Sequence, residues 1–416
     1  VFIGPYEHHT NELMWREAHA DVVVICLDKN GKIDLQDLKH KLSDPQYTNR
    51  RKFASFSAGS NVTGIRTQVY DIARICHRHD TFIFFDFAAV APYITIDMNH
   101  DKESSFDAIF FSPHKFLGGP GTCGVLVFNE KIYRKDLPPT TAGGGTVVYV
   151  GFKNHDFSED IETREKAGTP PILQAIKAAL ALELKEKIGV ETIEKVERLY
   201  TEYFIEGLKK IKNIELLGDI APDERVSIVS FNIRHNDRIL HPRFVATLLN
   251  DLFGIQSRAG CSCAGPYGHI LLGIDQVTSE KYRKLIVKGC EGIKPGWVRV
   301  NIHYTLSRED VEFIIQAIEF VARAGHLFLQ KYQFNMKTAE WNYIGFTQST
   351  PQFSLDDTFG QNTIPSHQIP SLRTSYFREA ETIAETLKKQ PSPSYIKHEK
   401  ALESLNYFYC CHKTEE

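Results

Sequence analysis

Residues 112–121 read SPHKFLGGPG and stand between two apolar runs, residues 108–111 and 124–128. Short apolar runs bounded by turn residues are typical of buried strands, and α/β proteins place functional side chains in the loops after such strands. Lys115 is the amine of this loop. A lysine amine that is partly withdrawn from water can act as a nucleophile toward an aldehyde. The loop therefore predicts a reactive lysine, with an ordinary surface lysine as the alternative.

A carboxylate occupies a matching position on an earlier strand. Asp86 directly follows the apolar run 81–85, which places it at the strand end where ligands bind to parallel sheets. A lysine and a carboxylate on neighbouring strands are what pyridoxal phosphate requires: the lysine forms a Schiff base, and the carboxylate keeps the pyridine nitrogen protonated so that the ring accepts electrons. Asp86 and Lys115 together favour a pyridoxal phosphate site over the alternative of a turn-capping aspartate.

The runs around this pair predict the fold class. The strand-like runs are residues 22–26, 53–57 and 81–86, and residues 69–76 carry apolar side chains at helical spacing. Strand, helix, strand with continuously apolar strands predicts an α/β fold around a mainly parallel sheet. Further strands are expected at 226–233 and 297–303.

Two helix starts are visible in the second half. Thr169, followed by two prolines, predicts a capped helix whose apolar face contains Ile172, Ile176 and Leu180. The sequence SRED at 307–310 predicts a capping box with an aspartate in the place of the usual glutamate, and a helix after it.

The composition excludes several classes of protein. The net charge of the 416 residues is −3, without a long block of like charge, so nucleic acid and an anionic membrane surface are not expected as partners. No apolar stretch is long enough to span a bilayer. Eight scattered cysteines indicate a reducing compartment and not a disulfide scaffold, so we expect a cytoplasmic protein, with organellar targeting left open.

Eight motifs in one order resemble the class V aminotransferase family and, within it, the cysteine desulfurases. They are EHHTN at 7–11 with Trp15, GSNVTG at 59–64, Asp86, SPHK at 112–115, GGGT at 143–146, EKAGTP at 165–170, the segment 258–264, and Arg299. The resemblance covers about residues 1–325. It implies a fold-type I transferase whose large domain has a mainly parallel, seven-stranded-type sheet, followed by a smaller α+β domain.

The resemblance also sets expected domain limits. Residues 1–190 would form the large pyridoxal phosphate domain, 191–330 the small domain, and 331–416 an extension with a linker, at 347–374, and a possible helix, at 377–389. The chain opens at Val1 within an expected strand, before which family members carry a phosphate-binding loop, so the resemblance implies an incomplete N terminus.

The matched positions carry the family's roles for cofactor binding. By resemblance, His8 would stack on the cofactor ring and relay protons, and Asn61 would lie near its phenolic oxygen and the substrate carboxylate. Ser112 and His114 would bind the phosphate beside Lys115. Thr146, in the glycine loop, would reach the phosphate of a neighbouring subunit, which implies a homodimer. The alternatives are a loop histidine, a turn asparagine and a plain flexible loop.

The remaining motifs bear on the substrate and the reaction. Arg258 and Arg299 are candidates for gripping an amino-acid carboxylate, because a guanidinium binds a carboxylate with two hydrogen bonds. Cys263 aligns with the loop cysteine that attacks the substrate sulfur in cysteine desulfurases, and a cysteine next to a cationic residue suits that role. Cys261 aligns with no nucleophile of the family. Half of a zinc site, or two small turn residues, are the alternatives, and we expect no metal.

One departure weakens the specific assignment. The desulfurases usually place glutamine three residues after the aspartate, in contact with the cofactor's phenolic oxygen, whereas this chain has Ala89. We expect a desulfurase-like lyase that takes sulfur from cysteine and passes it to an acceptor protein. An aminotransferase acting on a small amino acid is the alternative within the family, and it would not need Cys263. A non-catalytic binding protein is the alternative from another class.

Overall fold

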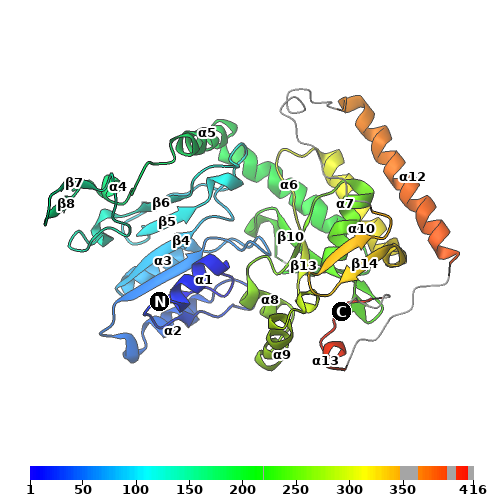
Figure 1. Ribbon diagram of the computed structural model, residues 1–416, viewed down its shortest axis with the longest axis horizontal. Helices are drawn as coiled ribbons and strands as arrows, with labels where there is room; N and C mark the ends of the chain where they lie inside the picture. Colours follow the sequence, from blue (N-terminus) through cyan, green and yellow to red (C-terminus); the bar gives the residue numbers. More distant parts are fainter. Residues whose placement is uncertain (219, 347–363, 391–399, 411–416) are drawn as a thin grey trace. The chain divides into compact units, whose positions relative to one another are not determined.

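The computed structural model describes residues 1–218, 220–346, 364–390 and 400–410. The chain forms two compact units (Figure 1). The first unit contains Val1–Ser60 and Arg66–Glu194, and the second contains Asn61–Ile65 and the chain from Lys195 onward.

A six-stranded sheet forms the centre of the first unit, with strand order β2-β1-β3-β4-β5-β6. The first five strands in this order run parallel, and β6 pairs antiparallel with β5. The α/β fold with a mainly parallel sheet is confirmed, with six strands in place of the seven-stranded type. The strands are β1 (Phe2–Ile3), β2 (Val23–Val24), β3 (Lys52–Ser57), β4 (Thr81–Asp86), β5 (Ala108–Phe111) and β6 (Val125–Phe128).

Three helices pack near this sheet, two of them through an apolar face and one through the polar side chains of Asn11 and Glu12. The predicted helix is α3 (Val69–Arg78), which packs on β4 and buries Ile72, Ala73 and Cys76 completely. The others are α1 (His9–Arg16), which packs on β3, and α2 (Leu35–Leu42), which packs on α3. Short 3-10 helices are η1 (Pro45–Tyr47), η2 (Pro113–Lys115) and η3 (Glu130–Ile132).

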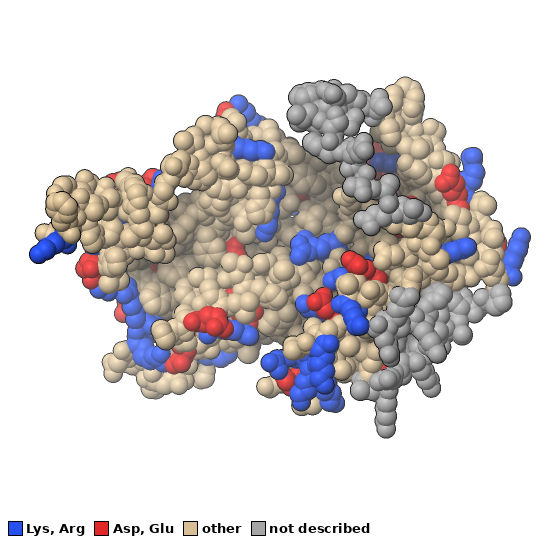
Figure 2. Space-filling model, viewed as in Figure 1, with Lys and Arg blue, Asp and Glu red and all other residues tan. Residues whose placement is uncertain are grey.

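The last part of the first unit differs from expectation. It contains the hairpin β7 (Val147–Val150) and β8 (His155–Phe157), then α4 (Ile161–Arg164) and α5 (Ile172–Ile188). Thr169 does not cap α5, because the helix begins only at Ile172 and its N-cap, Pro171, has no side chain that can accept a hydrogen bond. The predicted apolar face is exposed: Ile172 is 59%, Ile176 53% and Leu180 58% accessible. Figure 2 shows mostly uncharged residues where these elements lie, at the upper left.

An antiparallel sheet and a helical layer make up the second unit. The sheet has the order β11-β10-β13-β12, with β9 paired to β10. Its strands are β9 (Ile214–Leu217), β10 (Ile228–His235), β11 (Arg238–Ile239), β12 (Arg258–Gly260) and β13 (Trp297–Asn301). The helices are α6 (Val190–Lys209), whose first residues up to Glu194 belong to the first unit, α7 (Pro242–Phe253), α8 (Gly265–Leu271), α9 (Gln276–Val287) and α10 (Arg308–Phe328). The 3-10 helices are η4 (Pro222–Glu224) and η5 (Glu291–Ile293). The capping box of Ser307 and Asp310 at the start of α10 is confirmed.

The C-terminal residues belong to the core of the second unit. They form η6 (Leu329–Lys331), the hairpin β14 (Tyr332–Asn335) and β15 (Glu340–Tyr343), η7 (Ser366–Gln368), α12 (Ile369–Lys388) and α13 (Lys400–Glu403). Ala380, Ala384 and Phe408 are completely buried in the same cluster as Phe231 and Val298 of the sheet. The predicted helix exists but begins earlier, so the end of the predicted linker is helical, and residues 347–363 of that linker lie outside the described part. No helix among the described residues is long and apolar enough to cross a membrane.

Candidate active site

The carboxyl ends of four parallel strands meet at one edge of the first unit's sheet. These strands are β1, β3, β4 and β5. His8 follows β1, Asp86 is the last residue of β4, and residues 112–115 follow β5. This edge is where ligands bind in open α/β sheets. The fold thus brings the predicted cofactor residues of this unit to one edge, with the exception of Thr146.

Asp86 is held firmly at this edge. Its register partner on β3 is Ser57, and its carbonyl oxygen accepts a hydrogen bond of 2.8 Å from the amide of Ala58. Its carboxylate accepts another, also 2.8 Å, from the amide of Ala88. Burial raises the pKa of Asp86, while the Ala88 hydrogen bond and the charge of Lys115 act in the opposite direction.

A tight turn presents Lys115. Pro113 to Lys115 form η2, in which the amide of Lys115 donates to the carbonyl of Ser112 at 3.1 Å. A Cβ atom at Gly119 would lie 1.9 Å from the carbonyl oxygen of Pro113, so this close approach requires glycine. Lys115 and His114 are exposed and Ser112 is half-buried. The withdrawal of the Lys115 amine from water stays a prediction.

Glu7, the first residue of the EHHTN motif, lies beside this edge of the sheet and has no role by resemblance. Its buried carboxylate accepts hydrogen bonds from the amides of Gly4 and Ser57, the Ser57 hydroxyl (2.7 Å) and the Asn11 side chain (2.6 Å). Burial raises the pKa of Glu7 to about 7; these hydrogen bonds oppose the shift, and the charge of Asp86 adds to it. In the sequence, the position of Glu7 between an apolar run and the start of a helix was the feature that could have indicated its role.

His8 and Thr146 both use their side chains to close local structure. The His8 ring caps α1, because its Nδ1 accepts a hydrogen bond of 3.1 Å from the amide of Thr10. The Thr146 hydroxyl donates to the carbonyl of Gly143 at 2.7 Å and accepts from the Gly143 amide at 3.2 Å, which fixes the glycine loop. Their contacts with a cofactor stay predictions.

The other predicted residues gather in the second unit, to which Asn61 belongs by its contacts. The Arg299 guanidinium donates to the backbone carbonyl of Asn61, and the Asn61 side chain donates to the carbonyl of Ser262, both at 2.7 Å. Arg258 and Arg299 are direct register partners on β12 and β13. Like charges directly opposite each other are destabilising in a sheet. The pair therefore suits an anion such as a carboxylate, which both guanidinium groups can bind.

Cys263 lies in a tight turn directly after β12, the strand that carries Arg258. Arg258 Nη2 lies 3.8 Å from Cys263 Sγ and can donate a hydrogen bond to it. The turn runs from Cys261 to Ala264, whose amide donates to the Cys261 carbonyl at 3.1 Å. Its central residues, Ser262 and Cys263, have φ values of 52° and 56°. Such left-handed backbone costs roughly 1–2 kcal/mol per residue and is retained mainly at functional sites.

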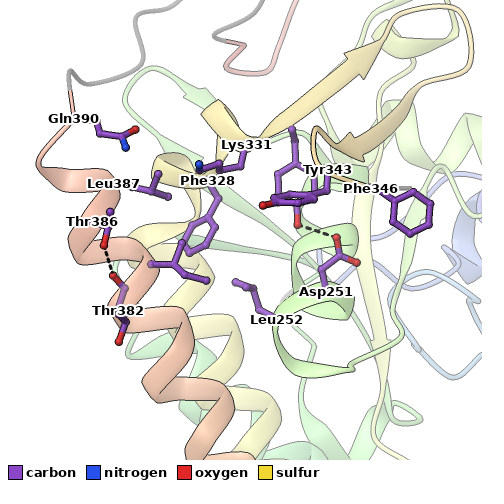
Figure 3. A pocket seen from close by; sticks show the side chains of 12 residues that line it. Asp251, Leu252, Phe328, Lys331, Tyr343, Phe346, Thr382, Thr386, Leu387 and Gln390 are labelled. Carbon is purple, nitrogen blue, oxygen red and sulfur yellow. Dashed lines mark hydrogen bonds between the residues drawn. The ribbon is translucent and has the colours of Figure 1, made fainter. Parts of the chain in front are cut away.

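Two of the pockets formed by the described residues lie within the second unit. The smaller, about 170 Å³, is lined by Cys261 and Cys263 among other residues. The larger, about 580 Å³, lies between α7, α12 and the β14–β15 hairpin, where Tyr332 donates a hydrogen bond of 2.8 Å to Asp251 (Figure 3). None of the predicted site residues lines this larger pocket. Across the described ranges, no three His, Cys, Asp or Glu side chains gather as a metal site would require.

Comparison with known proteins agrees with this geometry. The family model "Aminotransferase class-V" matches residues 1–314. Proteins called probable cysteine desulfurase from Halalkalibacterium halodurans and Staphylococcus aureus are each 33% identical over 270 residues, which is 64% of this chain and 62% and 61% of theirs. The chain therefore spans about 62% of the length of these curated relatives.

Solved structures show the same fold. The apo cysteine desulfurase of Thermococcus onnurineus superposes with a TM-score of 0.64 at 27% identity, covering 77% of this chain and 72% of that one. The cysteine desulfurase CsdA of Escherichia coli gives 0.62 at 23% identity, covering 76% and 70%, a likeness of fold alone.

A parallel sheet that carries a lysine and a buried carboxylate at its carboxyl edge, followed by an α+β unit, defines the fold-type I class of pyridoxal phosphate enzymes. Within that class, the chain belongs to the class V aminotransferase family.

Proposed function

We propose that this protein is a pyridoxal phosphate-dependent enzyme of the cysteine desulfurase type. The observation that carries the proposal is the contact of Arg258 with Cys263, beside the arginine pair of β12 and β13. The arginine pair can bind the carboxylate of a cysteine substrate, and the neighbouring thiol can attack its sulfur. The desulfurase names of the relatives support the same reading.

The residues of the sheet edge fit the cofactor. A buried carboxylate such as Asp86 gains most from a cationic partner, and the protonated pyridine nitrogen is one. Lys115 would hold the cofactor aldehyde, His8 its ring and Asn61 its phenolic oxygen, with Ser112, His114 and a partner's Thr146 at the phosphate. When bound, pyridoxal phosphate supplies an electron sink for the carbon that carries the substrate amine.

The chain's own residues then divide the work on cysteine. Arg258 and Arg299 bind and orient the carboxylate, as bidentate hydrogen bonds allow. The Cys263 sulfur attacks the substrate sulfur, the carbon–sulfur bond of the substrate breaks, and Cys263 keeps the sulfur as a persulfide. Lys115 moves the proton that the substrate carbon needs. Cysteine and the Cys263 thiol are thus converted into alanine and the Cys263 persulfide, and the reaction balances without an oxidant.

Two other functions make different predictions. An aminotransferase would use Lys115, Asp86 and the arginines but not Cys263. Ala89, in the place of the desulfurases' usual glutamine, weakens the desulfurase assignment and favours a non-catalytic binding protein. A non-catalytic binding protein would need none of this chemistry. Product analysis after addition of cysteine separates the three: alanine with sulfide, an oxo acid, or no product. An oxo acid without sulfide would overturn the desulfurase proposal.

We also propose a homodimer. Its support is the exposed apolar surface of the first unit, because large exposed apolar patches mark interaction surfaces. The side chains are Leu126, Val148, Tyr149, Val150, Phe152, Ile172, Leu173, Ile176 and Leu180. Sedimentation of the holoenzyme tests the proposal, and a monomer at all concentrations would contradict it.

We also propose a cellular setting, from the state of the cysteines. The described cysteines are free thiols, which suits a reducing compartment such as the cytoplasm and a sulfur-acceptor protein as partner.

A further inference from the structure

The pocket of about 170 Å³ in the second unit combines two thiols with basic side chains. We call it the thiol pocket. Its lining includes Cys261, Cys263, Arg243, Arg258 and Lys294. Glu291 is the acidic side chain of the lining, and His241 is neutral because burial lowers its pKa to about 3. The lining therefore carries more positive than negative charge and favours an anionic sulfur species.

The turn brings both sulfur-bearing residues to this pocket. Two central residues with positive φ and the hydrogen bond from Ala264 to Cys261 make it a type I′ turn. Gly, Asn and Asp dominate the central positions of that turn, so Ser262 and Cys263 hold it at a cost in backbone energy. The turn places Cys261 and Cys263 on the lining of one small cavity.

Residues beyond the family match close the pocket around Cys261. The match ends at residue 314, whereas Ala339 and Tyr407 also line the pocket. The Arg243 guanidinium donates to the Thr338 carbonyl at 2.9 Å, and the Tyr407 hydroxyl donates to the Lys294 carbonyl at 2.8 Å. The C-terminal part of this chain thus fixes two of the basic residues near Cys261.

We propose that Cys261 is a second sulfur-carrying residue, which takes the sulfane sulfur from the Cys263 persulfide inside the thiol pocket. The proposal rests on the proposed function, because it needs a persulfide on Cys263. It assigns Cys261 the task of holding the sulfur within the thiol pocket until an acceptor thiol collects it, while Cys263 is freed.

The transfer balances without an oxidant. The Cys261 thiolate attacks the outer sulfur of the Cys263 persulfide, so that a new sulfur–sulfur bond forms at Cys261. The bond between Cys263 Sγ and that sulfur breaks, its electron pair stays on Cys263, and the proton of the persulfide remains with the transferred sulfur. Arg258, which contacts Cys263, stabilises the thiolate that leaves. Cys263 is then ready for a second cysteine.

The test follows the sulfur through a single turnover. The holoenzyme receives cysteine labelled with a heavy sulfur isotope, and samples are alkylated over time and mapped by mass spectrometry. In the wild type, the label is expected on Cys263 first and on Cys261 later. Cys261→Ser should retain the label on Cys263, and Cys263→Ser should lose it from both positions. Cys290→Ser is the matched control, because Cys290 is a half-buried thiol of the same unit outside the pocket.

Each remaining outcome overturns one assignment. Label that stays on Cys263 alone in the wild type removes the role of Cys261 and leaves the proposed function intact. A disulfide between the two cysteines with release of sulfide also overturns the carrier role, because Cys261 would then have attacked the inner sulfur. Absence of label from every cysteine, with cofactor bound, refutes the proposed function itself. Label on Cys261 in Cys263→Ser refutes the order of transfer.

Discussion

The carboxyl edge of the first unit and the cysteine turn of the second are built in opposite ways. At the edge, Asp86 is held between strands, and the Glu7 carboxylate accepts four hydrogen bonds. In the turn, two residues other than glycine have positive φ, and the buried Ser262 hydroxyl has no hydrogen-bond partner among the described residues. Cofactor chemistry needs fixed groups, whereas sulfur transfer needs a nucleophile whose backbone can change conformation.

The largest effect is expected at the fixed edge. Lys115→Ala should abolish turnover, because it removes both the amine that holds the cofactor and the proton carrier, and the loss of proton transfer alone costs about 10²–10⁴-fold. Borohydride reduction and peptide mapping of the wild type should place the pyridoxyl group on Lys115. A pyridoxyl group on another lysine would contradict the assignment of this edge.

The next effect is expected at the turn and should leave the edge unchanged. Cys263→Ser should abolish sulfide release from cysteine while the absorption spectrum of the bound cofactor stays that of the wild type, because Asp86 and Lys115 are untouched. Cys261→Ser should still release alanine in the first turnover. Sulfide and alanine assays on both variants provide the measurement, and full sulfide release by Cys263→Ser would contradict the assignment of Cys263 as the attacking thiol.

A third effect concerns the stability of the edge. The folded-state pKa of Glu7 is raised from 4.5 to about 7, so the folded protein binds the proton more tightly than the unfolded chain. This contribution to stability is complete below pH 4.5 and is lost as the pH rises through about 7. Urea unfolding between pH 5 and 8 should show the loss in the wild type and a smaller one in Glu7→Gln. Identical pH profiles would show that Glu7 titrates normally.

Removal of the same carboxylate sharpens this test. Glu7→Ala leaves the amides of Gly4 and Ser57 and the Asn11 side chain without their acceptor, at about 1–3 kcal/mol for each buried donor. Exposed Glu17→Ala, in the same unit, is the matched control and should unfold as the wild type does.

The smallest expected effect is a gain in stability, whereas the preceding change, Glu7→Ala, should lower it. Ser262→Gly relieves a positive φ and removes the buried hydroxyl, so the second unit should gain about 1 kcal/mol of stability. The midpoint of urea unfolding, compared with Ser279→Gly on α9, measures it, because that control places glycine within a helix and should lower stability. A destabilised Ser262→Gly would mean that the turn is not strained.

Local patterns predicted the elements that depend on local chemistry. The runs at 53–57, 81–86 and 108–111 became strands, residues 69–76 became part of α3, and Ser307 formed its capping box. The start of α5 was wrong because the two prolines delay the helix, and its apolar face is exposed because helical spacing does not say what covers a helix.

For the candidate sites too, the sequence predicted what depends on local order and missed what depends on distant contacts. The sequence order of Asp86 and Lys115 was enough to place both at one edge, since parallel strands align their ends. The Glu7 network and the thiol pocket depend on contacts between residues far apart in the sequence, such as Arg243 with Thr338, which no spacing rule encodes. The ligand roles of the site residues and the domain limits drawn from the sequence stay predictions.

The short segment Asn61–Ile65 has a consequence for how this protein can be divided. It lies between residues of the first unit, yet Gly64 accepts a hydrogen bond from the amide of Val226, and Val62 accepts one from Ser230. A gene fragment that starts at Lys195 would therefore encode the second unit without five of the residues that belong to it. No single cut of the chain, whether by recombination, limited proteolysis or split-protein engineering, therefore yields both units complete.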